Sequence, residues 1–292
     1  MSECAPSKTS IAVIMLDPRC NMQCRFCITE DAIESVSYES ALKLLDWLKP
    51  RGFDNVVLGG GEPFLWKGNV LRLAQAAKKK GWLVQVGTNG TLLPDGFEHI
   101  QEIDRFVLPI ESTDAGVNDN LRIYHRSHHA LILDRLAKLK AAGKQVTLST
   151  IVTAQNIRGL KNLADFLNDY ANSGGLIHAW HLYQFIPEGR GGGLYPSEFL
   201  VHEKEYECAC AIIKGAGLPF PVFKRKDMYH SASVDFFWRI KEAWHSSKLG
   251  RLEIENEITA SGNPPRLFIG RKAQIEAFDE AVMQVVDNPM YQ

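Results

Sequence analysis

The chain has 292 residues, of which 45% are hydrophobic and 23% are charged, and its formal net charge is −1 at pH 7. Such a composition is typical of a soluble globular protein, and the small net charge gives no electrostatic reason to bind nucleic acid or an anionic membrane surface. No run of about 18 apolar residues occurs, and residues 1–10 lack the apolar core of a signal peptide. We therefore expect a cytoplasmic protein without a membrane segment.

Short apolar runs and helical patterns alternate along the first two thirds of the chain. Strands are expected at residues 11–16, 55–58, 82–87, 105–110, 145–152 and 178–186. Helical periodicity separates most of them, at residues 37–49, 70–80, 130–142 and 160–171. This order is typical of a parallel sheet with right-handed crossovers, and six units are too few for a closed eight-unit barrel. The sequence therefore predicts an α/β fold, a partial (β/α)6 barrel of the TIM type.

The chain is expected to divide into three segments. Residues 1–10 are expected to form a disordered lead-in, residues 11–193 the barrel core, and residues 194–292 a C-terminal segment that closes the barrel mouth on the substrate side. Within this last segment, residues 235–244 have a helical pattern, and the apolar spacing over residues 275–285 predicts a terminal helix.

A cluster of cysteines follows the first predicted strand directly. Cys20, Cys24 and Cys27 have the spacing C-x3-C-x2-C. Ligands of parallel α/β sheets bind at the carboxyl ends of the strands, where this loop lies. Thiolates bind zinc, copper(I) or iron–sulfur clusters, and ordinary electron-transfer clusters use four of them. Three cysteines therefore leave one metal position open or require a distant fourth ligand.

With the aromatic residue Phe26 before its last cysteine, this motif resembles the signature of radical S-adenosylmethionine (radical SAM) enzymes. The resemblance implies that Cys20, Cys24 and Cys27 bind three irons of a [4Fe–4S] cluster and that S-adenosylmethionine chelates the fourth. In that family, an electron from the cluster cleaves S-adenosylmethionine to a 5′-deoxyadenosyl radical, which abstracts hydrogen from the substrate. The resemblance also implies an electron donor such as flavodoxin or ferredoxin.

A second motif, GGGEP, follows the second predicted strand. A glycine run after a strand is often only a tight turn, but this one stands on the strand next to the cysteine loop. It resembles the GGE motif of the same family. The resemblance implies that Gly60 and Gly61 allow close backbone approach and that Glu62 accepts a hydrogen bond from the methionine ammonium, for which a carboxylate is a suitable partner.

Other positions also resemble cofactor contacts of the family. Phe26 corresponds to the aromatic residue near the adenine, and Glu111, after the fourth strand, stands near a polar contact of relatives. Arg126 resembles an arginine that pairs with the methionine carboxylate, and Ser149 matches a position that bonds the ribose. Residues 183–191 look like the segment whose backbone flanks the adenine.

The motifs CNMQCRFC, GGGEPFL, TNGTLL and YQFIPEGRG resemble the branch that contains the molybdenum-cofactor cyclase, viperin-type nucleotide enzymes and peptide maturases. Because only Cys208 and Cys210 follow residue 193, auxiliary clusters are not expected, and a single-cluster enzyme like viperin is the nearest type. We expect a small polar substrate such as a nucleotide, a sugar or another metabolite. Polar groups expected near the barrel mouth are candidate substrate contacts: His181, Tyr183, Arg190, Lys224 and Tyr229.

Other functions remain open on sequence grounds. A radical SAM enzyme that modifies a peptide or protein, or that activates a glycyl-radical enzyme, would carry the same motifs. A non-catalytic iron–sulfur or zinc protein would use the same cysteines, with a fourth ligand from residues such as His125, His128 or His129. Glu62 discriminates between the classes, because a structural metal site has no use for an ammonium-binding carboxylate. The reaction that follows hydrogen abstraction, as an oxidoreductase, lyase or mutase, cannot be read from the motifs.

Overall fold

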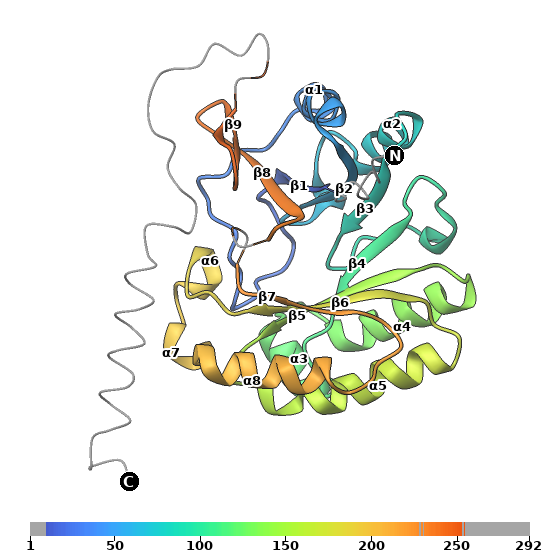
Figure 1. The fold of residues 1–292 in the computed structure, drawn as a ribbon, viewed down its shortest axis with the longest axis vertical. Coiled ribbons are helices and arrows are strands. Elements are labelled where there is room, and N and C mark those ends of the chain that lie inside the picture. The colour runs from blue at the N-terminus through green and yellow to red at the C-terminus, as the bar shows by residue number, and fades with distance from the viewer. Residues whose placement is uncertain (1–9, 228, 230, 253, 255–292) are drawn as a thin grey trace, which may run out of the picture.

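The structure of the protein is a computed structural model that describes residues 10–227, 229, 231–252 and 254 (Figure 1). It confirms the predicted alternation of strands and helices. The six central strands are β1 (Ser10–Asp17), β2 (Phe53–Gly60), β3 (Leu83–Gly87), β4 (Arg105–Pro109), β5 (Val146–Val152) and β6 (Ile177–Gln184). The helices among them are α1 (Tyr38–Leu48), α2 (Val70–Lys79), α3 (Ala115–Leu121), α4 (His128–Ala141) and α5 (Leu160–Asn172). Four 3₁₀ turns occur at Lys49–Arg51, Pro63–Leu65, Phe97–His99 and Ile157–Gly159.

Local signals account for most of these boundaries. Helix α1 begins after Ser37, whose side chain accepts a hydrogen bond from the amide of Ser40, and it buries the apolar face that the periodicity predicted. Helix α3 was not predicted, because its seven residues, AGVNDNL, are mostly small or polar and carry no amphipathic repeat. Its start is nevertheless capped by Asp114, which accepts from the amide of Val117.

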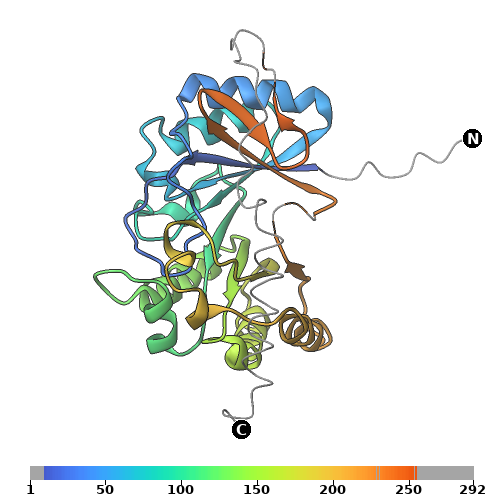
Figure 2. The same cartoon turned by 90° about the vertical axis from the view of Figure 1, so that its left-hand side faces the viewer.

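All six central strands pair in parallel, in the order of the chain, and two further parallel strands extend the sheet at its edges. Strand β7 (Val222–Arg225) pairs with β6, and strand β8 (Val234–Ile240) pairs with β1. Within the described residues, β7 and β8 are not bonded to each other, so the sheet is an open arc. Helices α1 and α2 cover one end of this arc, and α3, α5 and α8 lie at the other (Figures 1 and 2).

The prediction of a helix at residues 235–244 is wrong. This segment forms β8 and β9 (Ala243–Ser246), which make an antiparallel hairpin that continues into β10 (Gly250–Arg251). Lys241 and Glu242 both have positive φ, as a two-residue hairpin turn requires. Aromatic and aliphatic residues in this segment repeat at intervals that mimic a helix, but pairing with the distant β1 decides its conformation.

The remaining described elements lie between β6 and β7. They are the short helices α6 (Gly189–Gly192) and α7 (Pro196–Phe199) and the longer α8 (Glu203–Lys214). The hydroxyl of Tyr206 on α8 donates to the carbonyl of Leu182 at 2.7 Å and so ties α8 to β6. Residues 1–9, which include Cys4, lie outside the described residues, and so does the predicted terminal helix at residues 275–285. Among the described helices, none is long and apolar enough to cross a membrane.

Candidate active site

The two sequence motifs are joined through their backbones at the carboxyl ends of β1 and β2. The amide of Gly61 donates to the carbonyl of Asp17 at 2.7 Å, and the amide of Glu62 donates to the carbonyl of Arg19 at 2.8 Å. A Cβ atom on Gly61 would lie only 2.1 Å from that Arg19 carbonyl oxygen. The glycine is therefore required so that the GGE loop can pack directly against the cysteine loop.

Helix α6 holds the cysteine loop from its other side. The amide of Gly191 donates to the carbonyl of Cys27 at 3.0 Å, and a Cβ atom on Gly191 would lie 2.3 Å from the carbonyl oxygen of Cys24. The neighbouring Arg190 donates from its guanidinium to the carbonyl of Pro18. The structure thus places Arg190, a candidate substrate contact, against the cysteine loop instead of the cavity.

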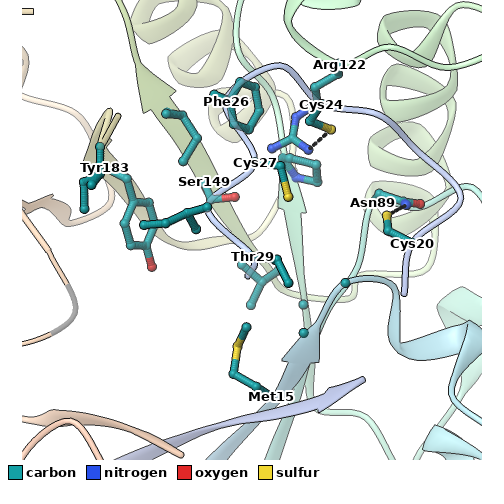
Figure 3. Close-up of a pocket in the computed structure, with 18 of the residues that line it drawn as sticks. Met15, Cys20, Cys24, Phe26, Cys27, Thr29, Asn89, Arg122, Ser149 and Tyr183 are labelled. Carbon is teal, nitrogen blue, oxygen red and sulfur yellow. Dashed lines mark hydrogen bonds between the residues drawn. The ribbon is translucent and has the colours of Figure 1, made fainter. Parts of the chain in front are cut away.

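These loops enclose one cavity of about 340 Å³, called the upper cavity here (Figure 3). All three thiols of the cysteine motif line it, together with Phe26 and the backbone of the GGE loop. The six residues of the two motifs that line it are Cys20, Cys24, Phe26, Cys27, Gly60 and Gly61. A group of soft sulfur ligands and a closely approaching glycine backbone therefore face the same space, as a sulfur-ligated metal group with a polar cofactor requires.

Burial disfavours the thiolate form of two cysteines of the motif, Cys20 and Cys24. Burial raises the pKa of the Cys24 thiol to about 12, although the nearby Arg122 opposes the shift, and burial also raises the pKa of Cys20. The guanidinium of Arg122 lies 3.8 Å from Cys24 Sγ, and Asn89 Nδ2 lies 3.5 Å from Cys20 Sγ (Figure 3). Because metals bind the thiolate, loading of this site would release protons.

The Glu62 carboxylate is fully buried and does not line the upper cavity. It accepts from the amide of Phe64 at 3.1 Å, from the hydroxyl of Thr88 at 2.8 Å and from the amide of Asn89 at 2.8 Å. Burial raises the pKa of Glu62, and these three donors oppose that shift. Glu62 thereby fixes Thr88 and Asn89, both of which do line the cavity.

Thr88 and Asn89 were not identified as site residues from the sequence. They belong to the stretch TNGT, which was interpreted only as part of a motif that resembles one branch of the family. Their position directly after β3 was a usable signal, because the carboxyl ends of all parallel strands meet at the same edge of the sheet. His128 supports them from α4, with its Nε2 2.9 Å from the carbonyl oxygen of Asn89.

A buried ion pair forms the wall next to Cys24. Arg122 contacts the Glu111 carboxylate with its Nη2 at 2.6 Å and its Nε at 2.7 Å, and the other Glu111 oxygen accepts from the amide of Ile151 at 2.7 Å. The same guanidinium lies 4.9 Å from the centre of the Phe26 ring. Burial raises the pKa of Glu111, while Arg122 favours its charged form. Arg122 lines the upper cavity, whereas Glu111 lies behind it.

Arg126 is exposed and does not line the upper cavity. Arg122 occupies the position beside the cysteines because the amide of Arg25 donates to the carbonyl of Leu121 at 3.2 Å, which brings the end of α3 onto the cysteine loop. This contact joins distant parts of the chain, so no local pattern distinguishes Arg122 from Arg126.

The other predicted site residues divide into two groups. Ser149 lines the upper cavity, and His181 and Tyr183 face the barrel interior from β6, their rings stacked at 6.0 Å. Lys224 is exposed and paired with a glutamate of α8, and Tyr229 packs against the apolar cluster under β8. The structure therefore brings Ser149, His181 and Tyr183 to the barrel interior. Lys224 and Tyr229 do not line the upper cavity.

Comparison with known proteins identifies the family to which the chain is similar. The family model described as "Radical SAM superfamily" matches residues 14–167. A protein of Nitratidesulfovibrio vulgaris named AdoMet-dependent heme synthase is 27% identical over 201 residues, which cover 64% of this chain and 51% of that protein. A protein of Flammeovirga pacifica named S-adenosylmethionine-dependent nucleotide dehydratase is 26% identical over 205 residues, which cover 64% of this chain and 66% of that protein. The chain thus spans less than two thirds of the length of either relative.

A solved structure has the same fold. The crystal structure of Streptococcus suis SuiB bound to S-adenosylmethionine matches with a TM-score of 0.62 at 16% identity, over 79% of this chain and 58% of that one. At this level of identity, the likeness extends to the fold alone.

Proposed function

Because the chain belongs to the radical SAM superfamily, whose members are enzymes that use a [4Fe–4S] cluster and S-adenosylmethionine, we propose that the upper cavity holds both groups. Cys20, Cys24 and Cys27 would each bind one iron. When bound, these groups supply a 5′-deoxyadenosyl radical that abstracts hydrogen from the substrate. The observation that carries the proposal is that all three thiols and the glycines of the GGE loop line one cavity.

The surrounding residues would bind and orient the cofactor. Gly60 and Gly61 leave room for its methionine end, and Arg122 offers a positive charge to its carboxylate, the role that the family resemblance implied for Arg126. Ser149 would bond the ribose, and Phe26 would lie near the adenine. These roles are supported by the lining of the upper cavity, which includes Phe26, Gly60, Gly61, Arg122 and Ser149. Arg126 does not line it.

The substrate would be a small polar molecule, and the reductant a flavodoxin or ferredoxin type of protein in the cytoplasm. Residues 11–193 would form the catalytic core and residues 194–292 the substrate-side segment. Two facts support this division: the described part of the later segment supplies both edge strands of the barrel, and it carries only two cysteines. A nucleotide substrate is consistent with the dehydratase relative, and a porphyrin with the heme synthase relative.

The proposal is tested by anaerobic reconstitution of the protein with iron and sulfide, followed by reduction and addition of S-adenosylmethionine. We expect about four irons per chain, a cluster spectrum that changes on addition of the cofactor, and formation of 5′-deoxyadenosine. Bound zinc, or a cluster whose spectrum ignores S-adenosylmethionine, would instead indicate a structural or electron-transfer protein.

The substitution Glu62→Gln should preserve the cluster and weaken S-adenosylmethionine binding roughly 10- to 100-fold, as expected for loss of one charged hydrogen bond worth about 1.5–3 kcal/mol. The amide nitrogen of glutamine cannot accept a hydrogen bond, so either the hydroxyl of Thr88 or the amide of Asn89 loses its acceptor and its fixed position at the cavity. Affinity is measured by titration of the reconstituted protein. The exposed Glu39→Gln serves as the matched control and should leave affinity unchanged. An unaltered affinity in Glu62→Gln would show that Glu62 does not position the cofactor site.

A further inference from the structure

A second cavity, called the lower cavity here, lies inside the barrel below the first. Its volume is about 220 Å³, and residues of the barrel strands line it, including Val13 of β1 and Val57 of β2. Val107, Tyr183 and Phe236 line both cavities. In Figure 3, Tyr183 lies across the upper cavity from Cys20. A molecule in the lower cavity would therefore be adjacent to whatever the upper cavity holds.

One guanidinium lines the lower cavity without a carboxylate partner. Arg225 of β7 donates from Nε to Nδ1 of His181 at 3.1 Å and from Nη1 to the hydroxyl of Ser231 at 3.3 Å. Its guanidinium lies 5.2 Å from the centre of the Phe223 ring. Among the residues that the structure describes, no carboxylate forms an ion pair with Arg225. A cation in such a setting is a natural partner for an anion.

The two histidines of the lower cavity are set up as hydrogen-bond donors. An arginine can only donate, so Nδ1 of His181 must accept from Arg225, and Nδ1 of His178 must accept from Arg105 at 3.2 Å. Burial, reinforced by Arg225, lowers the pKa of His181 to about 3, so the ring is neutral near pH 7. Burial and Arg105 likewise lower the pKa of His178. In a neutral imidazole whose Nδ1 accepts, Nε2 carries the proton.

We propose that the lower cavity binds the anionic group, a carboxylate or a phosphate, of a small organic substrate, with Arg225 as its charge partner and the imidazole of His181 as a second donor. The valines of β1, β2 and β4 would contact the carbon skeleton. Arg225 lines the lower cavity and not the upper one, so the cation lies outside the space that the cysteines line. This inference rests on the proposed function, because the reacting carbon would face the upper cavity.

The size of the lower cavity limits the substrate. Pockets for drug-sized ligands have volumes of roughly 300–1,000 Å³, and the lower cavity, at about 220 Å³, is smaller. It would accommodate a small metabolite, or the anionic end of a larger one whose remainder extends toward the upper cavity.

The test is calorimetric titration of the reconstituted, unreduced protein with excess S-adenosylmethionine, so that no reaction occurs. The probes are benzoate, phenyl phosphate and benzamide, the last being a neutral analogue of benzoate. We expect at least one anion to bind at least tenfold more tightly than benzamide. Arg225→Met should weaken that anion at least tenfold, and Arg225→Lys should retain most of the affinity. The exposed Arg158→Met removes the same charge elsewhere and should change nothing.

Each outcome is decisive. Preference for benzoate identifies a carboxylate subsite, and preference for phenyl phosphate identifies a phosphate subsite. The inference is overturned if benzamide binds as tightly as the anions or if no probe binds. It is also overturned if Arg225→Met binds the preferred anion as tightly as the unaltered protein does. If Arg225→Met does not fold in a thermal melt, the comparison of probes on the unaltered protein still decides. The change of the cluster spectrum on addition of S-adenosylmethionine is recorded in the same samples. This measurement distinguishes failure of the proposed function from failure of this subsite.

Discussion

Replacing Cys24 with alanine will remove the iron–sulfur cluster and the activity together. Two thiols cannot hold a [4Fe–4S] cluster, and the side chain that donates to Cys24 Sγ, the cationic guanidinium of Arg122, cannot replace the missing ligand. We expect iron content to fall from about four to less than about one per chain after reconstitution, with 5′-deoxyadenosine formation lost. Iron analysis and product chromatography on the same sample measure both effects.

Cys208→Ala is the matched control for this experiment. Cys208 lies on α8, is exposed and does not line the upper cavity, so its removal should leave the iron content and the cofactor cleavage unchanged. A full iron complement in Cys24→Ala would contradict the assignment of the cluster. Loss of iron in Cys208→Ala instead would place a ligand on α8.

Arg122→Met is expected to destabilise the protein by about 3–5 kcal/mol, because it leaves the Glu111 carboxylate buried without its cationic partner. The variant should also bind S-adenosylmethionine more weakly, since Arg122 lines the upper cavity. Urea unfolding measures the first effect, and titration of the reconstituted protein measures the second. An unfolding free energy within about 0.5 kcal/mol of the original would show that the ion pair contributes little.

Two further variants separate the contributions of this pair. Adding Glu111→Gln to Arg122→Met removes the buried charge, so the double variant should recover more than about 1 kcal/mol of the lost stability while the cofactor affinity stays low. Arg126→Met removes an exposed charge from the same segment and should change the unfolding free energy by less than about 0.5 kcal/mol. If Arg126→Met alone weakened cofactor binding, the role would belong to Arg126, as its resemblance to the family implied.

The local part of the site could be predicted from the amino-acid sequence. The cysteine spacing and the GGE motif each depend on residues close together in the chain, and strand periodicity was sufficient to place both at the same edge of a parallel sheet. The structure adds the reason for their coupling, because the amides of Gly61 and Glu62 donate to the cysteine loop. The contacts of the Glu62 side chain could not be predicted, since its three donors come partly from Thr88 and Asn89, which follow another strand.

By itself, the sequence determined the family, the six-strand core and the three cysteines, because these depend on short-range spacing and on periodic burial. Tertiary structure alone decided that the segment at 235–244 is a hairpin, since β1 offers it an edge on which to pair. It alone placed Arg122, and not Arg126, beside Cys24, and it alone placed Arg225 beside His181 in a cavity. Each of these outcomes depends on contacts between residues far apart in the chain, about which local pattern carries no information.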